Sequence, residues 1–135
     1  MASIRRDITV DQTPDSVWDA VADWGALHQR LAPGFVTDCR VEGRDRVVTF
    51  FNGSVVRERI LDCDDASRRL VWSIVEGPYE HHNGSAEVVA DGAGGARFIW
   101  TTDLLPDELA DGTAQMMEQG LSAVAATLSQ LSTSS

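Results

Sequence analysis

Two residues in the middle of the chain, Glu58 and His82, have side chains able to transfer protons, and both fall in segments with a strand pattern. In VVRERIL (55–61), alternation across the pleat places Val56, Glu58 and Ile60 on one face and the arginines on the other. An inward carboxylate must find a partner or be neutral. Glu58 is therefore either a ligand anchor or general base in a cavity, or a structural carboxylate bridged to a neighbouring arginine or to water.

His82 lies on a later strand segment, and the small residues Gly84 and Ala86 share its face. If this face is interior, His82 shares a cavity with Glu58 and the two form an acid/base dyad. The alternative is a hydrogen-bonded structural histidine. Because adjacent strand residues point to opposite faces, His81 and His82 cannot chelate together, and we predict neither a metal site nor a cofactor.

Large side chains are predicted to face the same interior. The segment LVWSIV (70–75) places Trp72 and Ile74 inward, and FIWTTDL (98–104) places Trp100 and Thr102 inward. Gly84 and Ala86, on the strand that follows 70–75 and precedes 98–104, leave room beside the rings of Trp72 and Trp100. Together with an inward carboxylate, this pattern indicates a sheet that lines a cavity rather than a filled core.

Turns and helices must hold these strands in place. Thr13 as N-cap and Pro14 at the first helical position predict a helix over 14–22, and a second short helix follows at 26–31. Asn52-Gly53 predicts a two-residue hairpin loop. Strands are predicted at 3–10, 35–42, 46–51, 55–61, 70–75, after Gly77-Pro78 and at 97–104, with Phe35, Thr37, Cys39 and Val41 on one face of the second.

The longest helical pattern runs from about residue 107 to 131 and includes Met116, Met117 and Gly120 among its apolar and small positions. Since this helix follows an antiparallel sheet, its apolar stripe must cover the sheet's concave face. We therefore predict an α+β fold, with a curved antiparallel sheet of six or seven strands, two short helices after strand one, and a long C-terminal helix over an internal cavity.

Composition narrows the range of partners. The 135 residues form one predicted domain (1–135) whose last few residues fray. The net charge is −10, and all 11 basic residues are arginines. Because such an acidic chain repels phosphate groups, we expect neither nucleic acid nor an anionic membrane as a partner. No segment approaches membrane-spanning length, and we predict a cytoplasmic protein. Cys39 and Cys63 are expected to be buried free thiols, and His28 is expected to be exposed.

The order of motifs resembles the SRPBCC superfamily, which includes START-type lipid carriers, birch-pollen allergens, polyketide cyclase/dehydratases and abscisic-acid receptors. The resemblance rests on VWDAVADWGAL, PGFVTDCRVEG, VVRERILDCDD, RRLVWSIVEG, HHNGS and FIWTTDLLPDE, in that order. It implies the helix-grip fold. The ERI, WSIVEG and NGSA stretches resemble those of bacterial relatives of the abscisic-acid receptors, which implies pocket-lining roles for Glu58, Trp72, Ile74, Gly84 and Ala86. The receptors' pocket lysine falls near Pro33, so abscisic acid is not the expected ligand.

Two functions follow from this sequence. The first is binding of a small, largely apolar, aromatic or polyketide-like molecule between the sheet and the C-terminal helix, by a monomer or weak homodimer. The second is an aromatase/cyclase or dehydratase in which Glu58 and His82 perform acid/base chemistry. The predicted binding residues are Phe35, Val56, Glu58, Trp72, Ile74, His82, Gly84, Ala86, Trp100, Thr102, Met116, Met117 and Gly120.

Overall fold

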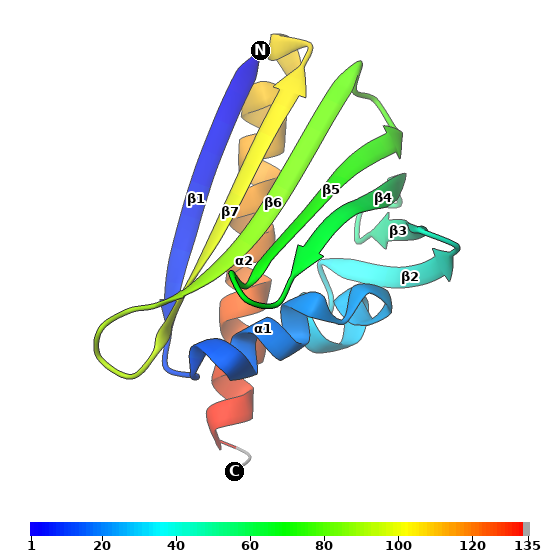
Figure 1. Cartoon of the computed structure of the whole chain (residues 1–135). Coiled ribbons are helices and arrows are strands. Elements are labelled where there is room, and N and C mark those ends of the chain that lie inside the picture. Colours follow the sequence, from blue (N-terminus) through cyan, green and yellow to red (C-terminus); the bar gives the residue numbers. More distant parts are fainter. Residues whose placement is uncertain (134–135) are drawn as a thin grey trace.

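A seven-stranded antiparallel sheet forms one layer of the molecule in the computed structural model, which describes residues 1–133. The strands lie in the order β1-β7-β6-β5-β4-β3-β2, so the first strand pairs with the last and the others form a meander (Figure 1). The strands are β1 (Ala2–Val10), β2 (Val36–Glu42), β3 (Asp45–Phe50), β4 (Val55–Asp64), β5 (Arg69–Glu76), β6 (His81–Ala90) and β7 (Ala96–Leu105).

Short helices follow β1, and a long helix follows β7. α1 (Pro14–Ala22) begins as predicted at Thr13, whose Oγ1 accepts a hydrogen bond from the Ser16 amide at 3.2 Å. The predicted second helix is a 3-10 turn, η1 (Trp24–Ala26), followed by a π-helical turn, η2 (Leu27–Leu31). The 3-10 turn η3 (Asp107–Leu109) leads into α2 (Ala110–Thr133).

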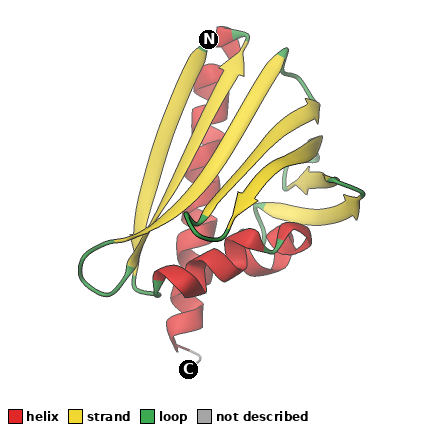
Figure 2. Ribbon diagram, in the orientation of Figure 1, coloured by secondary structure: helices red, strands yellow, loops and turns green. Residues whose placement is uncertain are grey.

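Helix α2 packs against the concave face of the sheet, and Figure 2 shows it crossing behind the strands. Its buried residues Met117, Leu121, Val124 and Leu128 recur at helical spacing and join the core. This arrangement confirms the predicted α+β helix-grip fold. The helix continues to Thr133, slightly beyond its predicted end. The residues predicted to fray are 131–135: residues 131–133 are helical instead, and 134–135 lie outside the described residues.

Strand β2 departs from the predicted alternation. A register shift between Val36 and Asp38 in the pairing of β2 with β3 breaks the period of two, so Val36 and Cys39 are buried while Thr37 is exposed. Val41 shares the face of Cys39 as predicted, since it lies opposite Arg46, but near the end of this edge strand it is 49% exposed. A bulge is a property of two paired strands, and this is why the pattern of one strand did not reveal it.

Two further side-chain predictions are wrong. Cys63 is exposed, as are Asp62 and Asp64 on either side of it, because this end of β4 extends beyond the core. Cys39 is a buried free thiol, as predicted, and burial raises its pKa. His28 is half-buried rather than exposed, and its Nδ1 is enclosed without a hydrogen-bond partner among the described residues.

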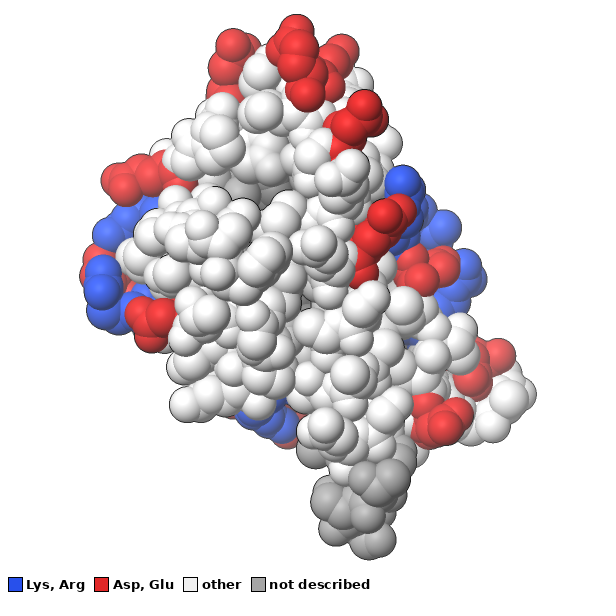
Figure 3. All heavy atoms as spheres, turned by 180° about the vertical axis from the view of Figure 1, so that it is seen from behind, with Lys and Arg blue, Asp and Glu red and all other residues white. Residues whose placement is uncertain are grey.

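The face that carries α2 has few charged groups at its centre. Figure 3 shows this side of the molecule, with acidic side chains gathered at its upper end and along the rim. The exposed carboxylates Asp107, Glu108 and Asp111 lie at the start of the α2 region. Among the described residues, no helix is long and apolar enough to cross a membrane.

Candidate functional site

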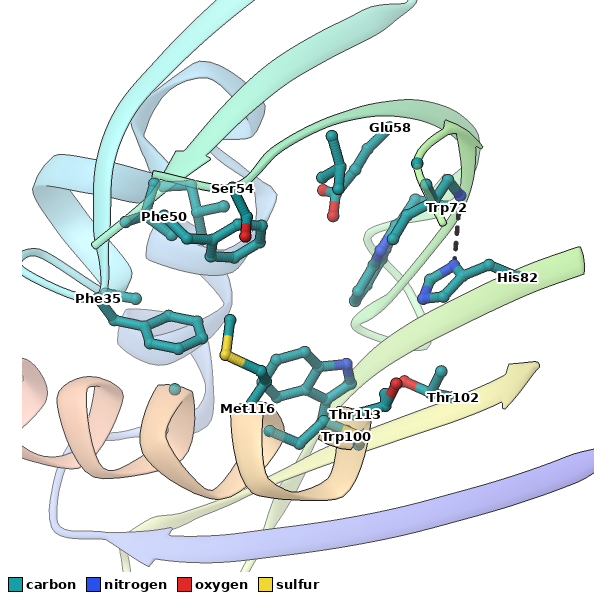
Figure 4. Close-up of a pocket in the computed structure, with 18 of the residues that line it drawn as sticks. Phe35, Phe50, Ser54, Glu58, Trp72, His82, Trp100, Thr102, Thr113 and Met116 are labelled. Atoms are coloured by element: carbon teal, nitrogen blue, oxygen red, sulfur yellow. Dashed lines mark hydrogen bonds between the residues drawn. The ribbon is translucent and has the colours of Figure 1, made fainter. Parts of the chain in front are cut away.

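A cavity of about 660 Å³ lies between the concave face of the sheet and α2. This volume is typical of small-molecule sites, and most of the lining side chains are apolar. The apolar and aromatic lining residues include Leu27, Leu31, Phe35, Phe50, Val56, Leu70, Trp72, Ile74, Phe98, Trp100, Leu109, Met116 and Met117. The close-up in Figure 4 shows the rings of Phe35, Phe50, Trp72 and Trp100 around this space.

All the predicted binding residues except Gly84 line the cavity. The others are Phe35, Val56, Glu58, Trp72, Ile74, His82, Ala86, Trp100, Thr102, Met116, Met117 and Gly120. Gly84 was expected to leave free space, but the Trp72 indole covers it: a Cβ at Gly84 would lie 2.6 Å from Trp72 Cε2. The missing side chain thus lets Trp72 lie flat against β6 and does not enlarge the ligand space.

Phe35 reaches the cavity from the loop before β2 rather than from the strand itself. Its ring lies 5.4 Å from the Phe50 ring in an edge-to-face arrangement. A Cβ at Gly120 would lie 3.0 Å from both the Phe35 and Trp100 rings. The absence of a side chain at Gly120 therefore allows α2 to approach these two aromatic walls.

Glu58 is bridged to a neighbouring arginine, one of the two alternatives that the sequence left open, and the partner is Arg46. Arg46 Nε donates a hydrogen bond to Glu58 Oε1 at 2.8 Å, and its Nη1 donates to the Trp24 carbonyl at 3.1 Å. The Arg46 and Glu58 side chains are only 6% and 8% exposed. The guanidinium also lies over the Trp24 ring, 3.7 Å from its centroid, so a stacked and ion-paired arginine holds the carboxylate.

The β3–β4 turn determines this pairing. Phe50 N–H donates to the Ser54 carbonyl, so the loop has three residues, Phe51 to Gly53, instead of the two that were predicted. Gly53 has a φ of +86°, as expected for the left-handed residue that ends such a loop. In this register Arg46 lies directly opposite Glu58.

With a two-residue loop, Arg46 would instead lie opposite Arg59, a side chain of the same charge. The sequence did contain a signal for Arg46: it is two and four residues before the apolar Val48 and Phe50, and residues two apart in a strand share a face. Arg46 therefore shares the inward face of β3.

His82 is buried and held as a neutral imidazole. Its Nδ1 accepts a hydrogen bond from the Ile74 amide at 3.2 Å, so the proton of the neutral ring is on Nε2. Burial, with a smaller contribution from the neighbouring His81, lowers the pKa of His82 to about 4. The ring lies 5.0 Å from that of Tyr79.

Glu58 and His82 face the same cavity but form no hydrogen bond with each other. Glu58 pairs with Ile74 of β5, whose amide binds His82 of β6, so a whole strand separates the two side chains. Two strand spacings correspond to roughly 10 Å. Figure 4 shows them at separate positions on the wall, with Trp72 between them. The direct dyad is therefore absent, and the two groups can act only on different parts of one bound molecule.

A polar contact joins the β5–β6 loop to α2 at the His82 end of the cavity. The Tyr79 hydroxyl lies 2.7 Å from Thr113 Oγ1, and both residues line the cavity. Exposed lining residues mark the opening: Asn52, Ser54 and Val55 from the β3–β4 turn, Gly77 and Pro78 after β5, and Glu108 and Gly112 near the start of α2. Tyr79 and Thr113 were missed because their proximity depends on how a loop and a distant helix pack.

A family model described as polyketide cyclase / dehydrase and lipid transport matches residues 1–133. The chain belongs to this family of the SRPBCC superfamily. The match extends over the seven strands and α2, so the predicted family is confirmed. No curated protein matches the sequence significantly.

Solved structures of the family's fold cover nearly the whole chain. A Thermobifida fusca protein studied by solution NMR has 26% identity and a TM-score of 0.76, covering 96% of this chain and 91% of that chain. Norcoclaurine synthase from Thalictrum flavum, in complex with dopamine and hydroxybenzaldehyde, has 18% identity and a TM-score of 0.75, with 98% and 87% covered. A Mycobacterium smegmatis START superfamily protein has 11% identity and a TM-score of 0.72, with 95% and 94% covered. These last two establish the shared fold alone.

Proposed function

We propose that this protein is a cytoplasmic binder of a small, largely apolar molecule that contains an aromatic or polyketide-like ring system. The observation that carries the proposal is the cavity of about 660 Å³ with its mainly apolar wall. A packed protein interior has few voids larger than a water molecule. A hollow of this size, open at one end, is therefore a site for a ligand.

The aromatic walls support a ligand with flat rings. Phe35, Phe50, Trp72 and Trp100 come from four different parts of the chain and present ring surfaces to one space. Offset stacking and edge-to-face contacts with such rings add to the burial of apolar area. Glu58 and His82 provide polar groups at two separate positions on the wall, which would orient a ligand.

The test is to identify what the protein retains when purified from the cells that naturally make it. Native mass spectrometry should detect a complex heavier than the chain, and extraction should release an aromatic or polyketide-like compound. Recovery of the protein without any retained small molecule, together with failure of aromatic probes to bind, would contradict the proposal.

A cavity-filling variant locates the ligand. Ile74 lines the cavity, whereas the next residue, Val75, is 42% exposed on the opposite face of β5. Ile74→Trp should weaken ligand binding by about 10-fold or more, since it occupies the ligand space. The matched variant Val75→Trp should bind as the wild type does. Equal loss in both variants would place the ligand elsewhere.

The second candidate function is a cyclase- or dehydratase-type enzyme. Two ionisable side chains, Glu58 and His82, face one cavity, and the buried, neutral His82 carries its proton on Nε2, from which it can donate a hydrogen bond to a ligand oxygen. In an enzyme, Glu58→Gln should reduce turnover by roughly 100-fold while ligand affinity changes little. For a binder, the same variant changes affinity only, and product analysis of the retained compound separates the two outcomes.

A further inference from the structure

We propose that the Arg46–Glu58 pair is a recognition site for an uncharged hydroxyl group, so that the ligand is an aromatic or polyketide-like alcohol or phenol. This inference rests on the proposed binding function and specifies the chemistry of its polar end. Both residues line the cavity, and Figure 4 shows the Glu58 carboxylate directed into it.

The pair retains hydrogen-bonding capacity that the protein does not use. Arg46 donates from Nε to Glu58 Oε1 and from Nη1 to the Trp24 carbonyl. Among residues 1–133, Arg46 Nη2 and Glu58 Oε2 have no hydrogen-bond partner. One donor group and one acceptor oxygen of the same ion pair are thus unused, in side chains that are more than nine-tenths buried.

A hydroxyl group matches both atoms at once. Its oxygen accepts from the guanidinium, and its hydrogen is donated to the free carboxylate oxygen. An ether or ketone oxygen satisfies only the arginine, and an apolar group that displaces water from the pair leaves both polar atoms unpaired.

Charge balance disfavours ionised ligands at this position. The carboxylate and the guanidinium compensate each other at 2.8 Å, so the pair has no net charge. A ligand carboxylate would have to compete with Glu58 for Arg46 and would lie next to a like charge. An ammonium group would compete with Arg46 for Glu58 in the same way. The Trp24 ring stacked on the guanidinium further holds Arg46 in this pair.

The experiment uses the wild-type chain and four probes with one ring system: naphthalene, 2-methoxynaphthalene, 2-naphthol and 2-naphthoate. Affinities are measured by calorimetry, with tryptophan emission as a second readout because Trp24 and Trp72 flank Arg46. We expect 2-naphthol to bind about 10-fold or more tightly than naphthalene, with 2-methoxynaphthalene between them and 2-naphthoate weakest.

Variants test whether the pair causes this preference. Removing one charge can unfold the protein, so the main variant replaces both partners, Arg46→Met with Glu58→Leu. It should bind naphthalene and lose the preference for 2-naphthol. The control is Arg59→Gln, whose side chain is 48% exposed on the opposite face of β4, and the preference should persist there.

The outcomes separate this inference from the proposed function. If all four probes bind wild-type protein equally, or if the double variant retains the 2-naphthol preference, the hydroxyl site is wrong while aromatic binding stands. If 2-naphthoate binds most tightly, Arg46 is an anion site and the inference is overturned. If no probe binds, both the inference and the proposed function fail.

Discussion

Arg46 and Glu58 place two opposite charges in a mostly apolar wall, and each depends on the other. A lone buried charge costs several kcal/mol, whereas a hydrogen-bonded pair is nearly neutral relative to apolar residues of similar volume. Arg46 is also stacked on Trp24 and bonded to its carbonyl, so the same side chain connects η1 to β3 and β4. Recognition and local stability therefore depend on the same contacts.

Replacing one partner of this pair should destabilise the fold more than replacing both. We expect Glu58→Leu or Arg46→Met alone to lower the free energy of unfolding by roughly 3–5 kcal/mol, and the double variant by less than either. Urea unfolding measures each value. As a control, Arg40→Met removes one partner of an exposed ion pair with Glu42 and should cost about 1 kcal/mol or less. Additive losses in the double variant would contradict the coupling.

His82 should make stability depend on pH. Its folded pKa of about 4 lies below the ordinary 6.5, so between these values the unfolded chain binds more protons than the folded one. Stability is fully present above about pH 6.5 and is lost as pH falls toward 4.

The wild type should lose roughly 2 kcal/mol more than His82→Gln when the pH is lowered from about 7 to about 5. Urea unfolding of both proteins at the two pH values gives the difference. Parallel losses would show that His82 is not protonated on unfolding.

At the scale of elements, the β3–β4 turn sets which residues of two strands face each other. Its three-residue loop ends at Gly53 in the left-handed region and aligns Arg46 with Glu58. Residues of the same turn also border the cavity opening. A local backbone requirement therefore controls both the charged pair and the shape of the entrance.

A glycine comparison tests this backbone requirement. A Cβ at Gly53 meets nothing within 4 Å, so Gly53→Ala should destabilise only through its φ of +86°, by about 1–2 kcal/mol. Gly112 in α2 also has open space, and there Gly112→Ala should stabilise by up to about 1 kcal/mol because alanine favours helix. Thermal and urea unfolding report both changes, and a neutral Gly53→Ala would show that the turn tolerates another conformation.

At the scale of the whole molecule, the curved sheet and α2 enclose a space that the core does not fill. Buried residues of α2 pack against one part of the concave face, while Met116 and Gly120 border the open volume. Core contacts elsewhere therefore offset the packing energy that is lost at the cavity. A ligand that fills the cavity should increase the free energy of unfolding of the whole chain.

Ligand-linked stability is the corresponding prediction. At a concentration of about 100 times its dissociation constant, 2-naphthol should raise the free energy of unfolding of wild type and Val75→Trp by roughly 2.7 kcal/mol. Ile74→Trp should show a much smaller rise at the same concentration. Thermal unfolding with and without the probe measures this. An equal rise in all three proteins would indicate binding outside the cavity.

The sequence by itself determined those features that depend on neighbouring residues along the chain. Strand alternation correctly placed Glu58, Trp72, Ile74 and His82 inward, because side chains of a pleated strand alternate whatever the partner. The Thr13 cap and the long amphipathic helix were predictable for the same reason, since caps and helical periodicity are local. Together these local signals were sufficient for the fold class.

Only the tertiary structure decided which of these side chains meet. The Arg46–Glu58 pair depends on a single residue of loop length, and β5 keeps Glu58 apart from His82. Trp72 covers Gly84 because two neighbouring strands align in one register. The bulge in β2 likewise exists only in its pairing with β3. Strand register, bulges and helix packing bring together residues that are distant in sequence. The interaction energies that favour one register or packing arise between two elements, so the pattern of a single segment does not reveal them.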